Sequence, residues 1–402
     1  MTSSQTITSA APPHAHDAAS LPDRLELFGV LSLFGMAGFL QFSIAIAQIM
    51  LTLAIGFWAV LLIVRRERVD APRFFWPLVA YGGATLVSAA LSASPRISFP
   101  DSKQLVLFLI VPMAYRLASG RRGALLLTIV MSLGAASAAL GIFQYGLLHF
   151  DQLSQRPQGT LGHYMTYSGL LMLVIGIAVA KLLFGRGERI WAGLVMPALI
   201  MAVALTSTRT AWVGVCAGTA VLFLMKDFRL LAVLPIVAAI TFAAAGPAIT
   251  ERLMSTFDAR NATRLDRLAM LREGVRMVRA HPLVGVGPNM VQELYGKYRD
   301  AGAVNEVNPH LHNVPMQIAA ERGLPALAAW LAMVGMLGVD LVRRFRRGDH
   351  RVVTAAALGA FASMLAAGLF EYNFGDSEFL MLFLLIVTLP FAVVRQTSPA
   401  AA

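Results

Sequence analysis

Long apolar runs separated by short polar and charged stretches follow one another along most of the chain. A helix that spans a bilayer needs about 20 consecutive apolar residues, with a range of about 17–25. The block 25–64 is too long for one span and is divided near Gln41–Ser43, and Pro112 predicts a kink or a re-entrant shape in a short fourth span. The predicted transmembrane helices are then twelve: 25–42, 44–64, 74–93, 104–118, 123–148, 164–184, 190–206, 210–226, 229–246, 324–342, 352–370 and 378–395.

Composition supports this all-α, polytopic architecture. Hydrophobic residues make up 57% of the 402 residues and charged residues only 14%, whereas ordinary soluble domains carry about 25% charged residues. These values exclude a water-soluble globule and a disordered or fibrous protein. The single cysteine, Cys216, excludes an intramolecular disulfide and is expected to be a small residue of the apolar core.

The spans divide the chain into five segments. Residues 1–23 are rich in Ala, Ser, Thr, Pro and His and lack the features of a signal peptide, so they are expected to form a disordered cytoplasmic tail. Residues 24–246 hold spans one to nine, 324–396 hold spans ten to twelve, and 397–402 form a second cytoplasmic tail. Residues 247–323 form a connection far longer than the usual loop, which indicates a function of its own.

Positive charge is distributed unevenly between the two sides of the predicted bundle. The chain carries 33 Lys+Arg against 22 Asp+Glu, a net charge of +11. The loops assigned to the inside hold Arg24, Arg65, Arg66, Arg68, Arg73, Arg116, Arg121, Arg122, Lys181, Arg186, Arg189, Lys226, Arg229, Arg343, Arg344, Arg346, Arg347, Arg351 and Arg395. The short outer loops hold Arg96, Lys103, Arg156 and Arg209. By the positive-inside rule both termini are cytoplasmic and 247–323 is periplasmic, so the basic excess requires no nucleic acid.

Within the outer segment, residues 264–280 show helical periodicity. The apolar face that is expected to pack inward consists of Leu268, Leu271, Val275 and Val278. Arg264 and Arg267 share this face, and an inward guanidinium must find an anion or hydrogen-bond acceptors. The alternatives are an internal salt bridge or an arginine that turns back to water. Pro282 should end the helix, and the glycines at 285 and 287 predict a turn.

His310 and His312 flank one residue immediately outside the tenth span, before a helix that runs through Glu321 and breaks at Gly323. An H-x-H pair can bind zinc, but no third ligand is evident nearby in the sequence, so no metal is predicted. A pair of structural histidines is the second interpretation. A general base at the membrane surface is preferred, because imidazole titrates near neutral pH.

Further polar features are predicted on the same outer side. Arg209 lies between spans seven and eight, Arg156 and His163 precede span six, and Glu371–Glu378 is an acidic turn that either holds an acceptor or pairs with the arginines of the long loop. Arginine binds phosphate in a bidentate manner. We therefore hypothesise a site for a lipid-linked diphosphate donor, in which arginines neutralise the diphosphate and a histidine takes a proton from an acceptor hydroxyl.

These residues give the chain a resemblance to the O-antigen ligase family, whose relatives include O-antigen polymerases and bacterial protein O-oligosaccharyltransferases. The similar stretches are TSTRTAW (206–212), RLAMLREGVRMVRAHPLVGVGP (267–288), HLHNVPMQIAAERG (310–323) and GTLGH (159–163). The chain departs from the family pattern at Met316, Leu271 and Ala326, where Leu, Trp and Gly are usual. These are packing positions, so they bear on the subfamily more than on the chemistry.

The resemblance implies a GT-C-like glycosyltransferase of the bacterial inner membrane, with its active site facing the periplasm. It implies transfer of a glycan from undecaprenyl diphosphate to a lipid A-core sugar, with inversion and without a metal or other cofactor. By the same resemblance His312 is the base, with His310 as the other candidate. The diphosphate ligands that it implies are Arg209 and Arg267, and the shared helix face adds Arg264 as a third candidate. The possible substrate-binding residues are Arg156, His163 and Asn313.

Two other functions remain open at this stage. A polymerase or a protein O-oligosaccharyltransferase would use the same donor, although a chain that ends directly after span twelve favours the ligase. A secondary transporter also fits twelve spans, but transporters usually show inverted repeats and polar residues near the midplane. Besides donor and acceptor, the expected partners are membrane lipids, and the oligomeric state is left open.

Overall fold

The computed structural model describes residues 20–152, 154–255 and 262–395, and over these residues the protein is all-helical. Most of the predicted tail 1–23 and all of 397–402 lie outside the described residues. The α-helices are α1 (Leu21–Phe39), α2 (Ile44–Val64), α3 (Phe75–Ala90), α4 (Pro95–Asp101), α5 (Ile110–Leu117), α6 (Arg121–Gly146), α7 (Tyr164–Phe184), α8 (Arg189–Leu205), α9 (Arg209–Lys226), α10 (Val233–Ala245), α11 (Pro247–Met254), α12 (Ala262–Ala280), α13 (Met290–Tyr298), α14 (Val314–Arg347), α15 (Arg351–Gly368) and α16 (Ser377–Ala392). Three 3-10 helices, η1 (Ser102–Leu109), η2 (Phe228–Ala232) and η3 (Asn373–Gly375), lie between them.

Each of the twelve predicted spans falls on helical residues. Six helical segments of the described chain are long and apolar enough to cross a membrane: α2, the segment 95–117, α6, α7, α14 and α15. Four shorter apolar helices are α3, α8, the segment 228–244 and α16. These features are those of a polytopic membrane protein, and the number of spans stays a prediction.

The predicted irregularity of the fourth span is present. The segment 95–117 runs as α4, η1 and α5, so that a 3-10 stretch replaces the α-helical pattern in its middle. Pro112 lies one turn beyond this stretch, in α5. A proline lacks the N–H that would bond the carbonyl four residues earlier, and its ring clashes with that carbonyl. The tighter turns of η1, which end at Leu109, agree with this local constraint.

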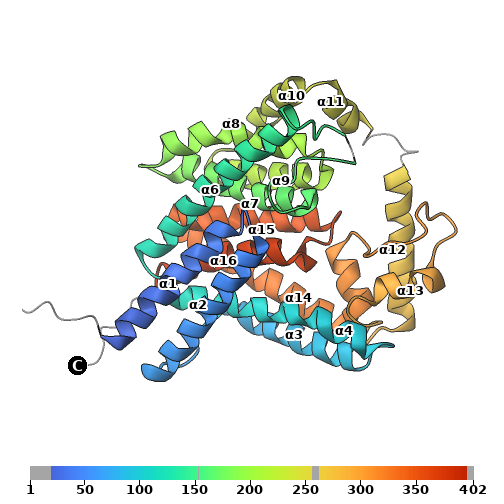
Figure 1. Cartoon of the computed structure of the whole chain (residues 1–402), viewed down its shortest axis with the longest axis horizontal. Helices are drawn as coiled ribbons and strands as arrows, with labels where there is room; N and C mark the ends of the chain where they lie inside the picture. The colour runs from blue at the N-terminus through green and yellow to red at the C-terminus, as the bar shows by residue number, and fades with distance from the viewer. Residues whose placement is uncertain (1–19, 153, 256–261, 396–402) are drawn as a thin grey trace, which may run out of the picture.

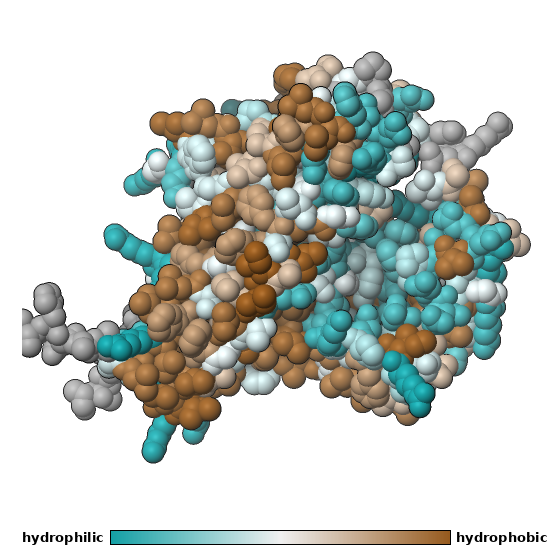
Figure 2. Space-filling view, in the orientation of Figure 1, coloured by the Kyte–Doolittle hydropathy of each residue, from teal (hydrophilic) through white to brown (hydrophobic). Residues whose placement is uncertain are grey.

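The interior of the bundle is built around α7 and α16. All residues of α16 from Phe379 to Ala392 are buried, and α7 is buried along most of its length. In Figure 1 these helices lie with α15 in the middle of the molecule, whereas α12 and α13 lie at one end. Figure 2 shows apolar side chains over α1 and α2 and hydrophilic ones gathered at the α12–α13 end. This polarity is that of a bundle with one end in water.

The turn after α12 packs against a kink in α14. Gly323 has non-helical backbone angles (φ 82°, ψ 171°) inside α14, and Gly285 and Gly287 also have positive φ, which agrees with the predicted helix break and turn. The amide of Val286 donates to the carbonyl of Ala320 over 2.9 Å, and the amide of Leu324 donates to that of Pro282 over 2.8 Å. The turn after α12 is thereby fixed to α14, the helix that directly follows the two histidines.

The predicted inward face of α12 is wrong. The buried residues of this helix are Asp266, Ala269, Met270, Glu273, Gly274 and Met277. Leu268 and Val275 are instead 44% and 37% exposed. Two carboxylates can face inward because the 300–308 loop supplies their donors: the amide of Asp300 donates to Glu273, and the amides of Val304 and Asn305 donate to Asp266. Of the four predicted inward residues, Val278 packs against the buried cluster around Met270 and Met277, whereas Leu268 and Val275 lie on the outside.

Cys216 is not a core residue. It is exposed on α9, where it lines an apolar cavity of about 280 Å³ between α7, α8, α9 and α10. The expected burial is therefore wrong, and the apolar run around Cys216 reflects a helix face that meets lipid or this cavity.

Candidate functional site

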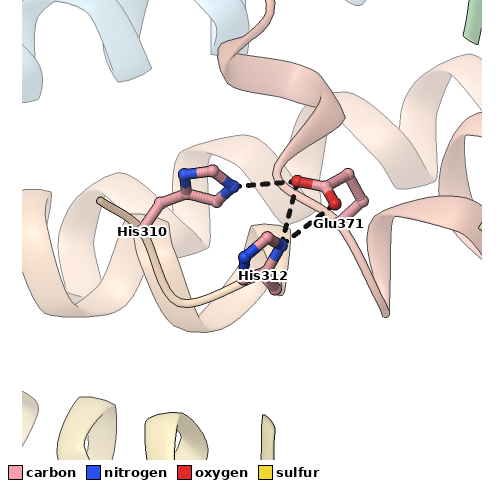
Figure 3. A group of neighbouring side chains, drawn as sticks. All are labelled: His310, His312 and Glu371. Atoms are coloured by element: carbon pink, nitrogen blue, oxygen red, sulfur yellow. Dashed lines mark hydrogen bonds and ion pairs between the residues drawn. The ribbon is translucent and has the colours of Figure 1, made fainter. Parts of the chain in front are cut away.

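Two histidines and a glutamate, from the loop before α14 and the connection after α15, meet in one cluster (Figure 3). The Nε2 atom of His310 lies 2.9 Å from Oε1 of Glu371. The Nδ1 atom of His312 lies 3.1 Å from Oε1 and 3.0 Å from Oε2 of the same carboxylate. The histidines come from the loop before α14, and Glu371 comes from the connection between α15 and η3. We name these three residues the His–Glu cluster.

The carboxylate of Glu371 is ionised. Burial alone would raise its pKa, but the hydrogen bonds from His310 and His312 and the electrostatic attraction to these side chains lower the pKa well below its ordinary value. The amide of Tyr372 donates a further bond to Oε1 over 3.1 Å. An ionised carboxylate only accepts hydrogen bonds, so Nδ1 of His312 is the donor in this pair. In the neutral imidazole the Nε2 atom then carries the free lone pair, which is the state a general base needs.

The backbone at His312 has a left-handed conformation, with φ at 48°. This conformation is uncommon for residues other than glycine, although His is among those that adopt it more often. Its neighbours hold it in place: the amide of Leu311 donates to Gln317 over 2.7 Å, and the side chain of Asn313 caps α14 by accepting from the amide of Met316 over 2.9 Å. Strained backbone supported in this way is typical of functional sites.

Four arginines line a cavity of about 300 Å³ beside the His–Glu cluster. We name it the arginine cavity; its arginines are Arg156, Arg209, Arg252 and Arg267, and His312 and Glu371 also line it. Arg209, the first residue of α9, donates to the carbonyl of Arg252 from Nε and Nη2, over 3.3 and 3.1 Å, and also to the hydroxyl of Ser255. The guanidinium of Arg156 lies over the ring of Tyr164, 4.0 Å from its centre.

The arginines of this cavity repel one another, and this repulsion disfavours their charged forms. Burial lowers the pKa of Arg252, and the charges of Arg209 and Arg156 lower it further. Burial also lowers the pKa of Arg267, while attraction to Glu371 opposes that effect. Arginine nevertheless stays protonated in proteins. A partly buried cluster of like charges creates a strong positive potential, so the cavity is suited to a multiply charged anion.

An apolar groove of about 370 Å³ joins the arginine cavity. The two share Arg209, Arg267 and His312 in their linings. The apolar side chains of the groove are Val213, Leu268, Leu271, Leu311, Leu369 and Phe370. The outward leucines of α12 thus form part of its wall, and a charged site lies at its end.

Four of the expected site residues, His310 among them, lie beside the arginine cavity rather than in it. Arg264 is exposed and lines the apolar groove, as does Asn313, whose amide donates to the carbonyl of Leu369 over 3.0 Å. His163 caps α7 and lines a further cavity of about 210 Å³, which also contacts His310, Glu371 and Asp376. Arg156, Arg209, Arg267 and His312 are the expected residues that the structure brings into one cavity.

Sequence reasoning missed the roles of Glu371 and Arg252. Glu371 was only one residue of an acidic outer turn with two open interpretations, and the structure pairs it with the histidines. Its position in that outer turn was the one signal available. Arg252 was one cation among many in the long loop, and no sequence signal set it apart.

The fold and the site define a polytopic membrane protein in which clustered arginines lie beside a histidine–carboxylate pair. Residues 194–331 match the family model described as O-antigen ligase. Over this part, about a third of its length, the chain is similar to the O-antigen ligase family, whose members are glycosyltransferase-like enzymes. The matched residues include Arg209, Arg267 and both histidines, whereas Glu371 lies beyond them. No curated protein shows a significant match to the chain.

Proposed function

We propose that the protein is an O-antigen ligase that transfers a glycan from undecaprenyl diphosphate to a sugar hydroxyl of lipid A-core. The observation that carries the proposal is the shared cavity of Arg209, Arg267 and His312, in which two guanidinium groups and an imidazole line the same space. In this proposal the enzyme is a GT-C-like protein with twelve spans in the bacterial inner membrane. Its termini are cytoplasmic and the site faces the periplasm.

The arginines are proposed to hold the diphosphate. A guanidinium forms two parallel hydrogen bonds to phosphate oxygens, and such charge-assisted bonds are about twice as strong as neutral ones. When the glycan leaves, the diphosphate gains one negative charge. Arg209 and Arg267 then interact more strongly with the product side of the reaction than with the donor, which is the condition for catalysis.

His312 is proposed to act as the general base through Nε2. The acceptor oxygen forms the new bond to the anomeric carbon, the bond from that carbon to the diphosphate oxygen breaks, and the hydroxyl proton moves to Nε2. Attack opposite the leaving group inverts the anomeric centre. Glu371 keeps the proton on Nδ1 and stabilises the imidazolium that forms, as a carboxylate does in other histidine-based sites.

The apolar groove supports a lipid-linked donor. Its wall of leucine, valine and phenylalanine side chains can take isoprenoid carbons while the arginines at its end hold the headgroup. A water-soluble nucleotide sugar has no hydrocarbon chain that would pack against this apolar wall. The groove therefore favours a polyprenyl donor over a soluble one.

The identity of the acceptor distinguishes the proposed ligase from a polymerase and from a protein O-oligosaccharyltransferase. The test is reconstitution of the purified protein with undecaprenyl-linked glycan and three acceptors offered in parallel: lipid A-core, a second lipid-linked glycan and an acceptor protein. Extension of lipid A-core supports the ligase. Extension of either other acceptor instead would identify a polymerase or a protein O-oligosaccharyltransferase, and movement of substrate across vesicles without glycan transfer would identify a transporter.

A further inference from the structure

The His–Glu cluster has the composition of a metal site. The sequence offered only two ligands, His310 and His312, and the structure adds the third, Glu371, from a distant turn. One ligand atom from each side chain lies within 4.8 Å of the other two. We propose that His310, His312 and Glu371 form a binding site for Zn²⁺, and that zinc in this site inhibits glycan transfer. The inhibitory part rests on the proposed function, whereas the binding site does not.

The present spacing is close to that of a zinc site. Zinc binds histidine nitrogen and carboxylate oxygen at about 2.0–2.2 Å, so neighbouring ligand atoms of a tetrahedral site lie about 3.3 Å apart. The two nitrogen–oxygen pairs of the cluster are 2.9 and 3.0 Å apart. These two pairs would have to separate by about 0.3–0.4 Å to reach that spacing. Two nitrogens and one carboxylate are also a donor set that suits zinc better than Mg²⁺ or Ca²⁺, which prefer oxygen.

The site is open to an entering ion. The three side chains keep between 13% and 26% of their surface exposed. Glu371 lines both the arginine cavity and the cavity that contains His163 and Asp376. A fourth coordination position can therefore be filled by water from either cavity.

Zinc in this position removes the base by fixing the wrong tautomer. In the metal-free cluster the proton of neutral His312 lies on Nδ1, where Glu371 accepts it. Nδ1 is also the atom that would bind zinc. Coordination moves the single imidazole proton to Nε2, and a protonated Nε2 cannot take a proton from the acceptor hydroxyl. Zinc also uses the negative charge of Glu371 that would stabilise the imidazolium.

The arginines oppose the ion and so provide an independent test. Arg267 is attracted to Glu371, and its positive charge competes with a cation for the same carboxylate. Removal of this charge should strengthen zinc binding. A variant that lowers catalysis but tightens metal binding could not be explained by general loss of structure.

Zinc binding can be measured without turnover. The full-length protein in detergent is titrated with Zn²⁺ by calorimetry and with Co²⁺ as a visible-absorption probe, in a background where His14 and His16 of the tail are replaced by alanine. We expect one ion per chain. His310→Ala and Glu371→Gln should each weaken binding by more than the roughly 10–100-fold that loss of an outer-shell partner causes. Arg267→Gln should tighten it, and His281→Ala, an exposed histidine of the outer segment, should leave it unchanged.

Three results would overturn the inference. Zinc stoichiometry that is the same in His310→Ala and Glu371→Gln as in the parent would place the ion elsewhere. Equal binding of Mg²⁺ and Zn²⁺ would contradict the donor set. In the wild-type protein, zinc anomalous scattering away from Glu371 would refute the site even if the variants fail to fold.

Inhibition by zinc is tested by measuring glycan transfer in the reconstituted system. Added Zn²⁺ should suppress transfer at the concentrations that fill the site, and EDTA should restore it. Unchanged or increased transfer with the site filled would refute inhibition. A protein that binds zinc at the cluster but transfers no glycan without zinc would contradict the proposed function and leave the site standing.

Discussion

Replacement of Glu371 by glutamine changes one charge at the centre of the site and almost no volume. The amide of Tyr372 donates to Oε1 of Glu371, so the glutamine oxygen should occupy this position. The amide nitrogen then takes the place of Oε2, which lies 3.0 Å from Nδ1 of His312. An amide N–H at that distance favours the tautomer in which Nδ1 accepts, over the bond that Nδ1–H could still donate to the glutamine oxygen 3.1 Å away. The favoured tautomer puts the imidazole proton on Nε2 and removes the base.

The expected loss can be bounded. General base catalysis contributes about 10²–10⁴-fold, and a change from carboxylate to amide beside the histidine of serine proteases costs about 10⁴-fold through the wrong tautomer. We therefore expect kcat of Glu371→Gln to fall by about 10²–10⁴-fold. The KM for the lipid-linked donor should change little, because the arginines remain.

The assay is steady-state transfer by reconstituted protein, with donor and acceptor varied separately at neutral pH. Because the pKa of Glu371 is held below its ordinary value, Glu371 is ionised in the folded protein throughout the neutral range. Its stabilising effect would be lost only as the pH falls through that lowered pKa. His281→Ala serves as the matched control. A kcat for Glu371→Gln within a factor of two of the wild type would refute the assigned tautomer and the role of the carboxylate.

Four further predictions concern the base, the donor site, metal independence and the α14 kink. His312→Ala should abolish transfer while the protein remains inserted and folded, and near-normal ligation in vitro would exclude it as the base. Arg267→Ala and Arg209→Ala should each lower kcat/KM for the donor by about 10–100-fold, since a hydrogen bond to a charged group contributes about 1.5–3 kcal/mol; unchanged donor affinity and turnover would remove that residue from the diphosphate site. Transfer should survive excess EDTA, and its loss would indicate a catalytic metal. Gly323→Ala should lower the Tm and the activity, because its Cβ would lie 2.2 Å from the carbonyl oxygen of Leu283 and its φ is 82°; Gly335→Ala, in the same helix with no neighbour within 4 Å, should preserve both.

The helices could be predicted because a bilayer leaves the backbone few alternatives. In hydrocarbon every N–H and C=O must bond within the segment, so a long apolar run is a helix almost irrespective of its side chains. The 3-10 stretch near Pro112 was also accessible, because proline acts on its own helix. Both inferences depend only on residues close together in the sequence.

The orientation of α12 could not be predicted in the same way. The hydrophobic-face rule assumes that water lies on the outside of a helix. Here the outside of α12 borders an apolar groove, and Leu268 and Leu271 line it. The inside holds Asp266, whose donors come from residues 304–308 of a loop that has no periodic pattern. Which face is buried was therefore decided by distant residues.

The site shows the same division between local and distant information. Arg209, Arg267 and His312 could be selected because their residue types fit one chemistry and the loop pattern assigned them to one side of the membrane. The partner of His312 could not, because Glu371 follows it by nearly sixty residues and two helices. An acidic turn is common at the outer end of a bundle, and only the folded structure distinguishes a carboxylate that orients a base from one that faces water.

The arrangement of charges explains why the carboxylate belongs in a site that otherwise attracts anions. In the proposed transfer, one positive charge appears on His312 and one negative charge appears on the diphosphate. Four arginines would strongly disfavour the imidazolium if nothing opposed them. Glu371, which contacts His312 directly and also lines the arginine cavity, puts a negative charge where the positive one develops. The arginines in turn face the leaving group. Each charge is thus formed beside its opposite, so the carboxylate is required because of the arginines rather than in spite of them.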